Sequence, residues 1–255
     1  MILVVDIGNT NLKIGLWDGD VLSTNWRLTT DYLRSWDEYG LQLLGLLTHF
    51  GLNLSALNGV AISSVVPPLT EKIQHAVKDY LELEPLIIHH KLKLGISIKY
   101  EYPSAVGTDR LCDAVAVQQK YGGPACIIDF GTATTFNALT ARGEYLGGAI
   151  TADLGVSADA LFQKAFKLPR VELKRPPSVI GKNTVHAMQS GLLYGYVALV
   201  DGMVSRFRLE LGEHMKVIGT GGMVATIAKE TNSISIVEPY LTLDGIRRVW
   251  EMNKK

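Results

Sequence analysis

The sequence predicts an α/β protein built from two similar domains. Runs of apolar and β-branched residues alternate with segments of helical periodicity, which is the pattern of mixed α/β folds. A second observation is an internal repeat, because one apolar strand ends at Asp6-Ile7-Gly8 and another ends at Asp129-Phe130-Gly131. The two aspartates lie 129 − 6 = 123 positions apart, close to half of the 255 residues. Such spacing favours two domains that face one another, each offering one loop to a shared cleft.

The composition narrows the class of partner. The chain is 47% hydrophobic, which is enough for a buried core. Lys plus Arg number 25 and Asp plus Glu number 25, so there is none of the basic excess that nucleic-acid binding normally needs. Cys112 and Cys126 form no C-x-x-C pair, which argues against a disulfide framework or a thiolate zinc site and suits a reducing cytoplasm. We therefore expect a cytoplasmic protein with small-molecule substrates, no nucleic-acid partner and no membrane partner.

The first half of the chain opens with three expected antiparallel strands. Apolar runs at 2–5 and 12–17 precede a third run at 21–28, which follows the turn signal Asp18-Gly19-Asp20. Leucines at helical spacing then predict a helix over 36–50. The other elements expected here are strands at 59–63 and 85–89 and helices at 68–80 and 109–119. The domains are placed at 1–114 and 115–255, with the last helix able to pack back on the first domain.

The second half repeats the opening plan and then adds helices. Pro124–Asp129 is an expected strand, and 188–207 is expected to form one long helix. Gly191 and Gly195 lie four apart on that helix, a spacing typical of close packing against another helix, within the chain or across a dimer. A short strand at 216–218 is expected to lead through glycines into a helix over 223–230.

The first Asp-x-Gly loop has the chemistry to bind a phosphate and a cation. Asp6-Ile7-Gly8-Asn9-Thr10-Asn11 offers a carboxylate, a flexible turn and three polar side chains, and its N–H groups can cradle phosphate oxygens. A carboxylate beside a triphosphate implies a cation between them, so we expect Mg²⁺ held by Asp6 and Asp129, directly or through water. Lys13 follows the loop and could balance phosphate charge. The alternative is an ordinary β-hairpin with a polar turn.

Two further segments add to this prediction. Asp129 is followed by Gly131 and by hydroxyls from Thr132 to Thr135, and a carboxylate at the end of an apolar strand needs a cation or a donor as partner. The alternative is a threonine-rich strand. Gly219-Thr220-Gly221-Gly222, expected between a strand and a helix, could let a base or a ribose lie against bare backbone. A tight turn at a helix entry would account for one of its glycines only.

The segment Gly107-Thr108-Asp109-Arg110 is the candidate for substrate chemistry. Asp109 is expected at the start of a helix, where it could accept the proton of an attacking hydroxyl. Arg110 could pair with a substrate carboxylate. The alternatives are a helix N-cap for Asp109 and a surface position for Arg110.

Taken together and in this order, the segments resemble type III pantothenate kinases. The resemblance rests on Asp6–Lys13, Gly107–Arg110, the Asp129 loop and Gly219–Gly222. Gly147-Gly148-Ala149-Ile150, Leu168-Pro169 and Ile180–Thr184 also fit, so it spans nearly the whole chain. It implies two ribonuclease-H-like (actin-like ATPase) domains with a nucleotide cleft between them, as in acetate and sugar kinases, heat-shock chaperone ATPases and actin. It further implies a homodimer that phosphorylates the 4′-hydroxyl of pantothenate with ATP, the first step toward coenzyme A.

The resemblance also implies a role for each matching residue. Asp109 would be the general base, Asp6 would bind Mg²⁺ through water, and Asp129 would bind a monovalent cation, K⁺ or NH₄⁺. The residues implied to hold ATP are Asp6, Ile7, Gly8, Asn9, Thr10, Asn11, Leu12, Lys13, Thr132, Gly219, Gly221 and Gly222. The residues implied to contact pantothenate are Tyr100, Gly107, Thr108, Asp109, Arg110 and Thr184.

Three positions depart from the family pattern. Thr108 stands where Ala is usual, Tyr102 where Asn is commoner, and Ala152-Asp153 where Pro-Gly is usual. The last departure bears on the local loop shape. Two other functions stay open at this point, namely a kinase of the same fold acting on a sugar or another small hydroxy acid, and a nucleotide-dependent regulator without turnover.

Overall fold

The computed structural model describes residues 1–254, and these form two compact units. Unit 1 consists of residues 1–120 together with the segment from 241 onward, and unit 2 consists of 121–240. The boundary expected at residue 114 falls instead inside helix α3 (Thr108–Lys120), which runs without interruption to the end of the first segment. The last helix, α7 (Leu241–Asn253), is part of unit 1. Unit 1 is therefore discontinuous in sequence, and unit 2 is contiguous.

Unit 1 contains a mixed five-stranded sheet in the order β3-β2-β1-β4-β5. Strand β1 pairs antiparallel with β2 and parallel with β4, while β3 and β5 form the two edges. The three opening strands expected from sequence are confirmed. The strands are β1 (Ile2–Ile7), β2 (Asn11–Asp18), β3 (Val21–Thr29), β4 (Gly59–Ser64) and β5 (Leu86–Ile87).

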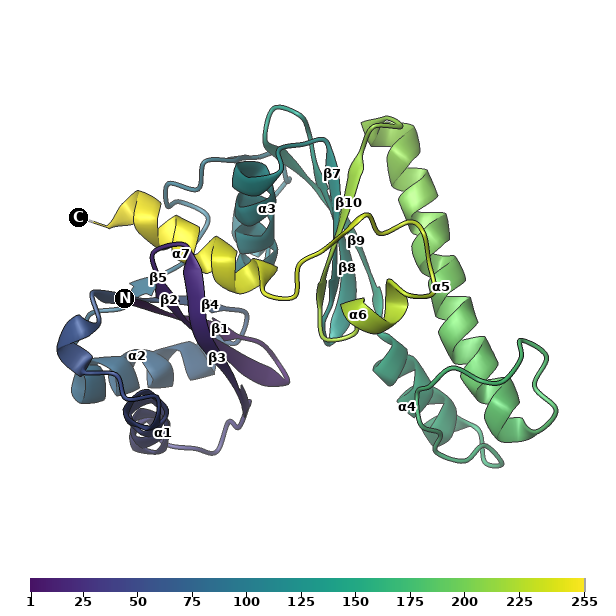
Figure 1. Ribbon diagram of the computed structural model, residues 1–255, viewed down its shortest axis with the longest axis horizontal. Helices are drawn as coiled ribbons and strands as arrows, with labels where there is room; N and C mark the ends of the chain where they lie inside the picture. The colour runs from purple at the N-terminus through teal and green to yellow at the C-terminus, as the bar shows by residue number, and fades with distance from the viewer. Residues whose placement is uncertain (255) are drawn as a thin grey trace. The chain divides into compact units, whose positions relative to one another are not determined.

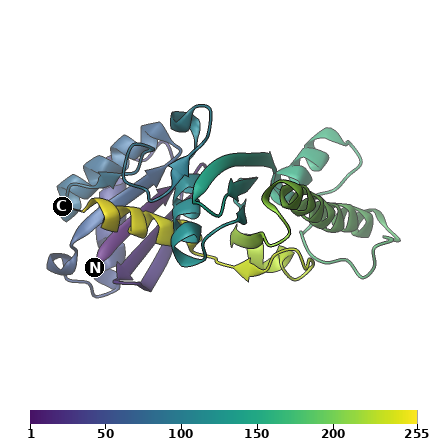
Figure 2. The ribbon, with the colours of Figure 1, turned by 90° about the horizontal axis from the view of Figure 1, so that it is seen from above.

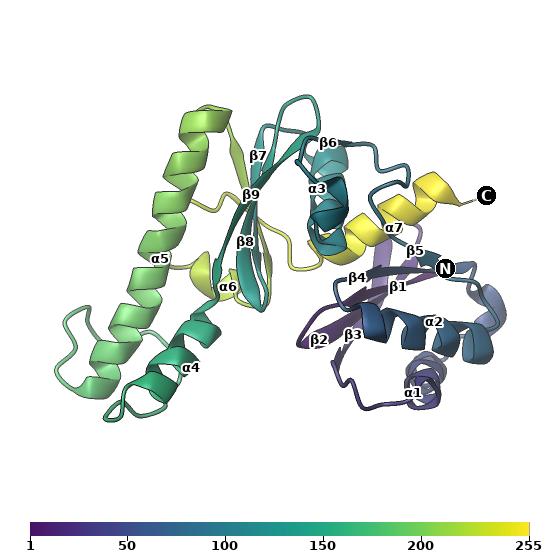
Figure 3. The same cartoon turned by 180° about the vertical axis from the view of Figure 1, so that it is seen from behind.

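Side-chain alternation along β1 assigns its two faces. Leu3, Val5 and Ile7 belong to the core cluster formed with helices α1 (Trp36–His49) and α2 (Pro67–Leu81). Because neighbouring strand residues point to opposite faces, Asp6 points to the other face. Figures 1 and 3 show α1 and α2 beneath the sheet, and α3 and α7 on its other side. The alternation thus turns Asp6 toward α3.

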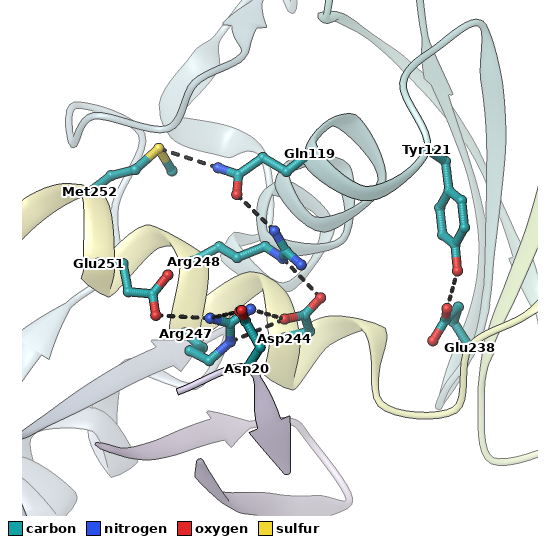
Figure 4. Close-up of polar contacts among 9 residues, drawn as sticks. All are labelled: Asp20, Gln119, Tyr121, Glu238, Asp244, Arg247, Arg248, Glu251 and Met252. Carbon is teal, nitrogen blue, oxygen red and sulfur yellow. Dashed lines mark hydrogen bonds and ion pairs between the residues drawn. The ribbon is translucent and has the colours of Figure 1, made fainter. Parts of the chain in front are cut away.

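Buried charge attaches α7 to unit 1. The Arg247 guanidinium is almost fully buried and pairs at 2.8 Å with Asp244, Asp20 and Glu251. It also stacks over the Trp17 ring, 5.1 Å from the ring centroid. These carboxylates raise the Arg247 pKa against the opposing effect of burial, so the side chain stays charged. Figure 2 shows the yellow α7 lying across the purple strands of unit 1, and Figure 4 shows the ion pairs that hold it there.

The end of α3 is joined to α7 by a second set of contacts in Figure 4. Arg248 donates to Asp244 at 2.9 Å and to the Gln119 side-chain oxygen at 3.0 Å. Gln119 in turn contacts the Met252 sulfur. In unit 2, the Tyr121 hydroxyl donates to Glu238, so the first and last segments of that unit are also joined to each other.

Unit 2 repeats the strand order of unit 1. Strand β7 (Ala125–Phe130) pairs antiparallel with β8 (Ala133–Leu139) and parallel with β10 (Lys216–Gly221). Strands β9 (Glu144–Ala152) and β11 (Ile236–Val237) extend the sheet on either side. The spatial order β9-β8-β7-β10-β11 corresponds strand for strand to β3-β2-β1-β4-β5. The parallel and antiparallel pairings are also the same in the two units. Each unit is thus ribonuclease-H-like, and β1 and β7 occupy the same place.

One long helix covers a face of the second sheet. Helix α5 (Thr184–Leu211) packs Leu193, Tyr196 and Val200 against apolar residues of β7 and β8. Figure 3 shows α5 along the sheet, with α4 (Leu154–Lys164) near its N-terminal end. The helix is longer at both ends than the 188–207 segment expected. Asn183 caps it by accepting the His186 N–H at 2.8 Å, which fixes where it begins.

Several smaller elements complete the description. Gly219 and Gly221 lie inside β10, so the expected strand of 216–218 is too short, and the turn before α6 begins only at Gly222. The helix expected over 223–230 is reduced to a single turn, α6. The remaining elements are β6 (Ser97–Ile98), the 3₁₀ turns η1 (Leu54–Ala56) and η2 (Pro103–Ala105), and α6 (Val224–Ile227). Among the helices of residues 1–254, none has the length and apolar character to cross a membrane.

Candidate functional site

The Asp6 carboxylate is the buried polar centre of unit 1. It is 5% exposed and lies beside Lys13 on β2 and Ser63 on β4, its two partners in strand register. Lys13 Nζ is 3.5 Å from Asp6 Oδ2, and Ser63 Oγ is 3.3 Å from Asp6 Oδ1. Residues paired across adjacent strands point to the same face of the sheet, and their Cβ atoms lie about 5 Å apart. The strand register therefore brings these three side chains together.

The loop after Asp6 is a tight, exposed turn. The Gly8 N–H donates to the Asn11 carbonyl at 3.0 Å, and the Gly8 carbonyl accepts the Thr30 hydroxyl at 2.6 Å. A Cβ at Gly8 would lie 3.2 Å from the Asn11 carbonyl oxygen, so a side chain here would be tight but not excluded. Asn9 and Thr10 are exposed at the tip, and Asn11 is half-buried, while Ile7 and Leu12 are buried in the core. The loop therefore offers backbone and polar groups to a ligand, whereas Ile7 and Leu12 hold its base.

Helix α3 begins directly beside this centre. Thr108 is its first residue, and the Thr108 hydroxyl lies 3.0 Å from Ser63 Oγ. It also accepts the Ser64 N–H and donates to the Ser64 carbonyl, each at 3.0 Å. Contact of Thr108 with substrate stays a prediction, and its side chain also contacts the end of β4. The hydroxyl cluster thus links Asp6 on β1 to the first turn of the helix that carries Asp109.

Asp109 is half-buried at the second position of α3. Its Oδ1 accepts the Arg110 N–H at 2.8 Å, and a Cβ at Gly107 would lie 2.4 Å from that oxygen. The first helical hydrogen bond runs from the Leu111 N–H to the Gly107 carbonyl at 3.2 Å, so Gly107 occupies the cap position. The N-cap alternative for Asp109 is therefore wrong. Arg110 is buried rather than on the surface.

Acidic groups crowd the buried face of this turn. Burial, and then the charges of Asp6, Asp113 and Asp109, raise the pKa of the Cys112 thiol well above its usual range. An interaction with Ser63 acts in the opposite direction and lowers the Cys112 pKa. A protonated thiol is a weak donor and a poor nucleophile, so Cys112 acts here as a small buried group.

Asp129 is the matching carboxylate of unit 2, with different neighbours. It is 9% exposed, and its register partners are Thr135 on β8 and Thr220 on β10. A Cβ at Gly221 would lie 2.5 Å from Asp129 Oδ1, and Gly221 has a φ of +92°. Glycine is required at 221 by both the close approach and the backbone conformation. Asp129 therefore lies against bare backbone, whereas Asp6 lies against Lys13 and Ser63.

The glycines after Asp129 in the same unit have separate structural reasons. A Cβ at Gly219 would lie 2.7 Å from the Val224 side chain, so this glycine admits the single turn of α6. The Gly222 N–H donates to the Phe130 carbonyl at 3.0 Å, and a Cβ there would meet no atom closer than 4.0 Å. Packing thus explains Gly219 and Gly221, and leaves Gly222 as the one of the three with open space.

The other predicted contacts lie on the surface of their own units. Tyr100 is 36% exposed in unit 1, and Thr132 is exposed in the turn between β7 and β8 in unit 2. Thr184, at the start of α5, lines an open hollow of about 670 Å³ in unit 2. The hollow is also lined by Leu161, Leu168, Gly181, Lys182, Asn183, Ala187, Met188, Gly191 and Leu192. Thr184 is therefore beside a space large enough for a small ligand.

Asp153, which stands where the family usually has glycine, caps a helix. Its Oδ2 accepts the Gly155 N–H at 2.9 Å, at the start of α4. The Asp153 charge also acts on the Tyr196 hydroxyl. Burial raises the pKa of Tyr196 to about 12, and the charges of Asp153 and Asp129 raise it as well. At the position that departs from Pro-Gly, this chain thus has a hydrogen-bonded helix cap.

Comparison with known proteins assigns the chain to a family. The model for the family described as type III pantothenate kinase matches residues 2–206. The type III pantothenate kinase of Roseiflexus sp. (strain RS-1) is 48% identical over 254 residues, covering 100% of each chain. This chain belongs to the type III pantothenate kinase family. The family assigned by resemblance from the sequence motifs is thereby confirmed.

Solved structures agree on the fold of this family member. A candidate 2-dehydro-3-deoxygalactonokinase from Sinorhizobium meliloti matches with a TM-score of 0.61 at 12% identity, over 98% of each chain. A candidate Baf family transcriptional activator from Campylobacter jejuni also gives 0.61, at 19% identity and the same coverage. At such identities the likeness concerns the fold alone.

Sequence reasoning missed two residues of the kinase's Asp6 centre. Ser63 and Ser64 end β4 and carry the contacts between Asp6 and Thr108. A signal was present, since two polar residues close an otherwise apolar strand. The sequence does not say which residue these serines contact. The parallel register of β1 with β4 shows that Ser63 lies beside Asp6.

Proposed function

We propose that this chain transfers the γ-phosphoryl group of ATP to the 4′-hydroxyl of pantothenate, with Asp109 as the general base. In this step a bond forms between the 4′-oxygen and the γ-phosphorus, and the bond from that phosphorus to the β–γ bridging oxygen breaks. The hydroxyl proton passes to the Asp109 carboxylate, and ADP leaves. Full-length membership of the type III pantothenate kinase family supports the reaction.

The placement of Asp109 is the observation that carries the proposal of its role. The side chain is half-buried, its Oδ1 is fixed by the Arg110 N–H at 2.8 Å, and Gly107 leaves room for it. A base needs a fixed carboxylate within reach of the proton it takes. Arg110, buried one position on, is proposed to pair with the pantothenate carboxylate, with Tyr100, Gly107 and Thr184 as further contacts.

Asp6 has the surroundings expected of an Mg²⁺ site beside phosphates. A hard cation prefers oxygen ligands, and Mg²⁺ usually keeps several waters and takes one or two carboxylates together with substrate phosphates. Residues 1–254 contain no group of three or more His, Cys, Asp or Glu side chains that could hold a metal, so a single carboxylate with waters and phosphates fits the donors present. When bound, the ion would neutralise charge on the transferring phosphate. Lys13, 3.5 Å from Asp6, is proposed to add a positive charge there, with residues 7–12 and Thr132 around the phosphates.

Asp129 is proposed to bind a monovalent cation, K⁺ or NH₄⁺. The carboxylate is buried against Gly221, and a Cβ at Gly221 would lie 2.5 Å from both Asp129 Oδ1 and the Phe130 carbonyl oxygen. Carbonyl oxygens together with one carboxylate suit a large cation of low charge better than Mg²⁺. Mg²⁺ demands near-ideal octahedral coordination with short distances to its ligands. Gly219, Gly221 and Gly222 are proposed to border the nucleoside.

A homodimer through α5 is proposed as the working form. Cβ atoms built at Gly191, Gly195 and Gly202 would meet nothing within 4 Å, so these small residues face open space. Their spacing of four and then seven keeps them on one side of the helix, where small residues allow close approach of another helix. Gly195→Trp should reduce the mass measured by light scattering from dimer to monomer, while Leu209→Ala at an exposed position should leave it unchanged.

A coupled ADP assay tests the reaction directly. ADP release should depend on pantothenate, and the product should gain one phosphoryl group by mass spectrometry. Pantothenate lacking the 4′-hydroxyl should give no release, and a panel of sugars and other hydroxy acids should give little. Release that is the same with and without pantothenate would overturn the proposal. The cytoplasmic location and the absence of nucleic-acid or membrane partners stay predictions.

A further inference from the structure

The hydroxyl cluster beside Asp6 contains more contacts than protons. Three contacts run in a line, from Asp6 Oδ1 to Ser63 Oγ (3.3 Å), on to Thr108 Oγ1 (3.0 Å), and on to the Ser64 carbonyl (3.0 Å). Each of these contacts needs one hydroxyl proton as donor. Ser63 and Thr108 supply one proton each. Only two of the three contacts can therefore be hydrogen bonds at one time.

The two hydroxyls have two consistent directions. In the first, Thr108 donates to Ser63 and Ser63 donates to Asp6. In the second, Ser63 donates to Thr108 and Thr108 donates to the Ser64 carbonyl. Chains of hydroxyls that point the same way strengthen one another, so mixed arrangements are less favourable. The Ser64 N–H donates to Thr108 in both directions, at 3.0 Å.

The charge on Asp6 selects between these directions. Lys13 pairs with Asp6 Oδ2, and the anionic carboxylate is still a strong acceptor at Oδ1, so without a bound metal ion Asp6 draws the Ser63 proton. A cation bound at Asp6 takes up the oxygen lone pairs and lowers that attraction, which favours the second direction. In that direction the Ser64 N–H donates to the Thr108 hydroxyl, and the hydroxyl donates to the Ser64 carbonyl. The first turn of α3 is then held to β4 by two hydrogen bonds instead of one.

We propose that Ser63 and Thr108 form a reversible hydroxyl relay that couples cation binding at Asp6 to the anchoring of the α3 turn carrying Asp109. This inference rests on the proposed function, because it takes Asp6 as the cation ligand and Asp109 as the base. Thr108 is a positioning residue in this account. The neighbouring Cys112 thiol does not compete strongly, since a thiol is a weak donor and a weak acceptor.

Amide hydrogen exchange in the presence of ADP measures the relay without turnover. In the wild type, adding Mg²⁺ to the ADP complex should slow exchange of peptides covering 107–115 by about fivefold, the effect of one ordinary hydrogen bond. Ser63→Ala removes the connection to Asp6 and should reduce this Mg²⁺ effect to less than about twofold. Thr108→Val, which keeps the shape and loses the hydroxyl, should do the same. Thr108→Ser keeps the hydroxyl and should restore the wild-type effect.

Thr70→Ala is the matched control for the loss of a hydroxyl. Thr70 donates to Ser64 Oγ at 2.7 Å and so touches the same strand end without joining the line to Asp6. This variant should retain the full Mg²⁺ effect, and melting curves should show that each variant is folded. Steady-state kinetics should show a kcat about fivefold lower in Thr108→Val with the KM for ATP unchanged.

The outcomes separate the relay from the proposed reaction. An undiminished Mg²⁺ effect in Ser63→Ala and Thr108→Val, or no Mg²⁺ effect in the wild type, would overturn the relay. Loss of the effect in both variants supports it, even if ADP release proved independent of pantothenate, an outcome that would overturn only the proposed reaction.

Discussion

The ends of β1 and β7 are the same place in two copies of one fold, yet they have different surroundings. Asp6 pairs in register with Lys13 and Ser63, whereas Asp129 pairs with Thr135 and Thr220. The next position on the parallel neighbour is Ser64 in unit 1 and Gly221 in unit 2. Topology thus fixes where a carboxylate lies at each strand end. We propose that the groups beside each carboxylate decide which cation it binds, a phosphate-bound divalent ion at Asp6 and a large monovalent ion at Asp129.

The proposed base, Asp109, belongs to unit 1, and replacing it should give the largest effect. Asp109→Asn keeps the side-chain shape and removes the proton acceptor, so kcat should fall by roughly 10²–10⁴. Binding of MgATP, measured by calorimetry, should change little because the residues proposed to hold ATP are untouched. A variant that turns over at the wild-type rate would remove Asp109 as the base.

A second difference is that unit 1 needs a segment from the far end of the chain, while unit 2 is contiguous. Arg247→Met should lower the free energy of unfolding of unit 1 by about 1–3 kcal/mol, because the buried Asp244 carboxylate then keeps only Arg248 as a partner. Arg248→Met is the control and should cost less, because its guanidinium is more exposed than that of Arg247 and the variant leaves Arg247 on Asp244. Equal melting curves for the two variants would show that the buried charge does not anchor α7.

Gly221 tests whether bare backbone is required beside Asp129. A Cβ there would lie 2.5 Å from both Asp129 Oδ1 and the Phe130 carbonyl oxygen, at a positive φ. Gly221→Ala should therefore cost about 2–4 kcal/mol in unfolding free energy. Gly8→Ala, in the loop after Asp6, is the comparison; the atom nearest to a Cβ there is 3.2 Å away, so this variant should cost less. If Gly8→Ala proves the more damaging, the contrast between the sites is misassigned.

The smallest expected effect concerns the helix that follows β9 in unit 2. Asp153→Ala removes the cap of α4 and should lower stability by about 1 kcal/mol in chemical denaturation. Asp153→Asn, which can still accept the Gly155 N–H, should lose much less. Similar losses in both variants would show that the charge of Asp153, rather than its cap, stabilises α4.

Much of the fold followed from the sequence, because strand alternation and the repeated Asp-x-Gly loop are local signals. The three opening strands lie within two residues of their expected bounds. Domain limits were less predictable, since the ion pairs of Arg247 that join α7 to unit 1 link residues far apart in sequence. The strand expected at 216–218 was ended too early because glycines disfavour strands, and only pairing with β7 shows that Gly219 and Gly221 belong to β10.

The candidate site was predictable to a similar degree. Asp6, Asp109 and Asp129 were found from motifs, and each lies at or beside a strand end or a helix start. What Ser63 and Thr108 contribute could not be found that way. Their meaning depends on the parallel register of β1 with β4 and on α3 beginning against it, which are tertiary facts.

The central claim is that the two matching aspartates serve different cations. Activity measured against Mg²⁺ and against K⁺, in Asp6→Asn and in Asp129→Asn, tests it most directly. Asp6→Asn should raise the Mg²⁺ concentration needed for half-maximal rate while keeping the preference for K⁺ or NH₄⁺ over Na⁺. Asp129→Asn should abolish that preference and leave the Mg²⁺ midpoint in place. If both variants shift the response to the same ion, the two sites are not distinct and the account is contradicted.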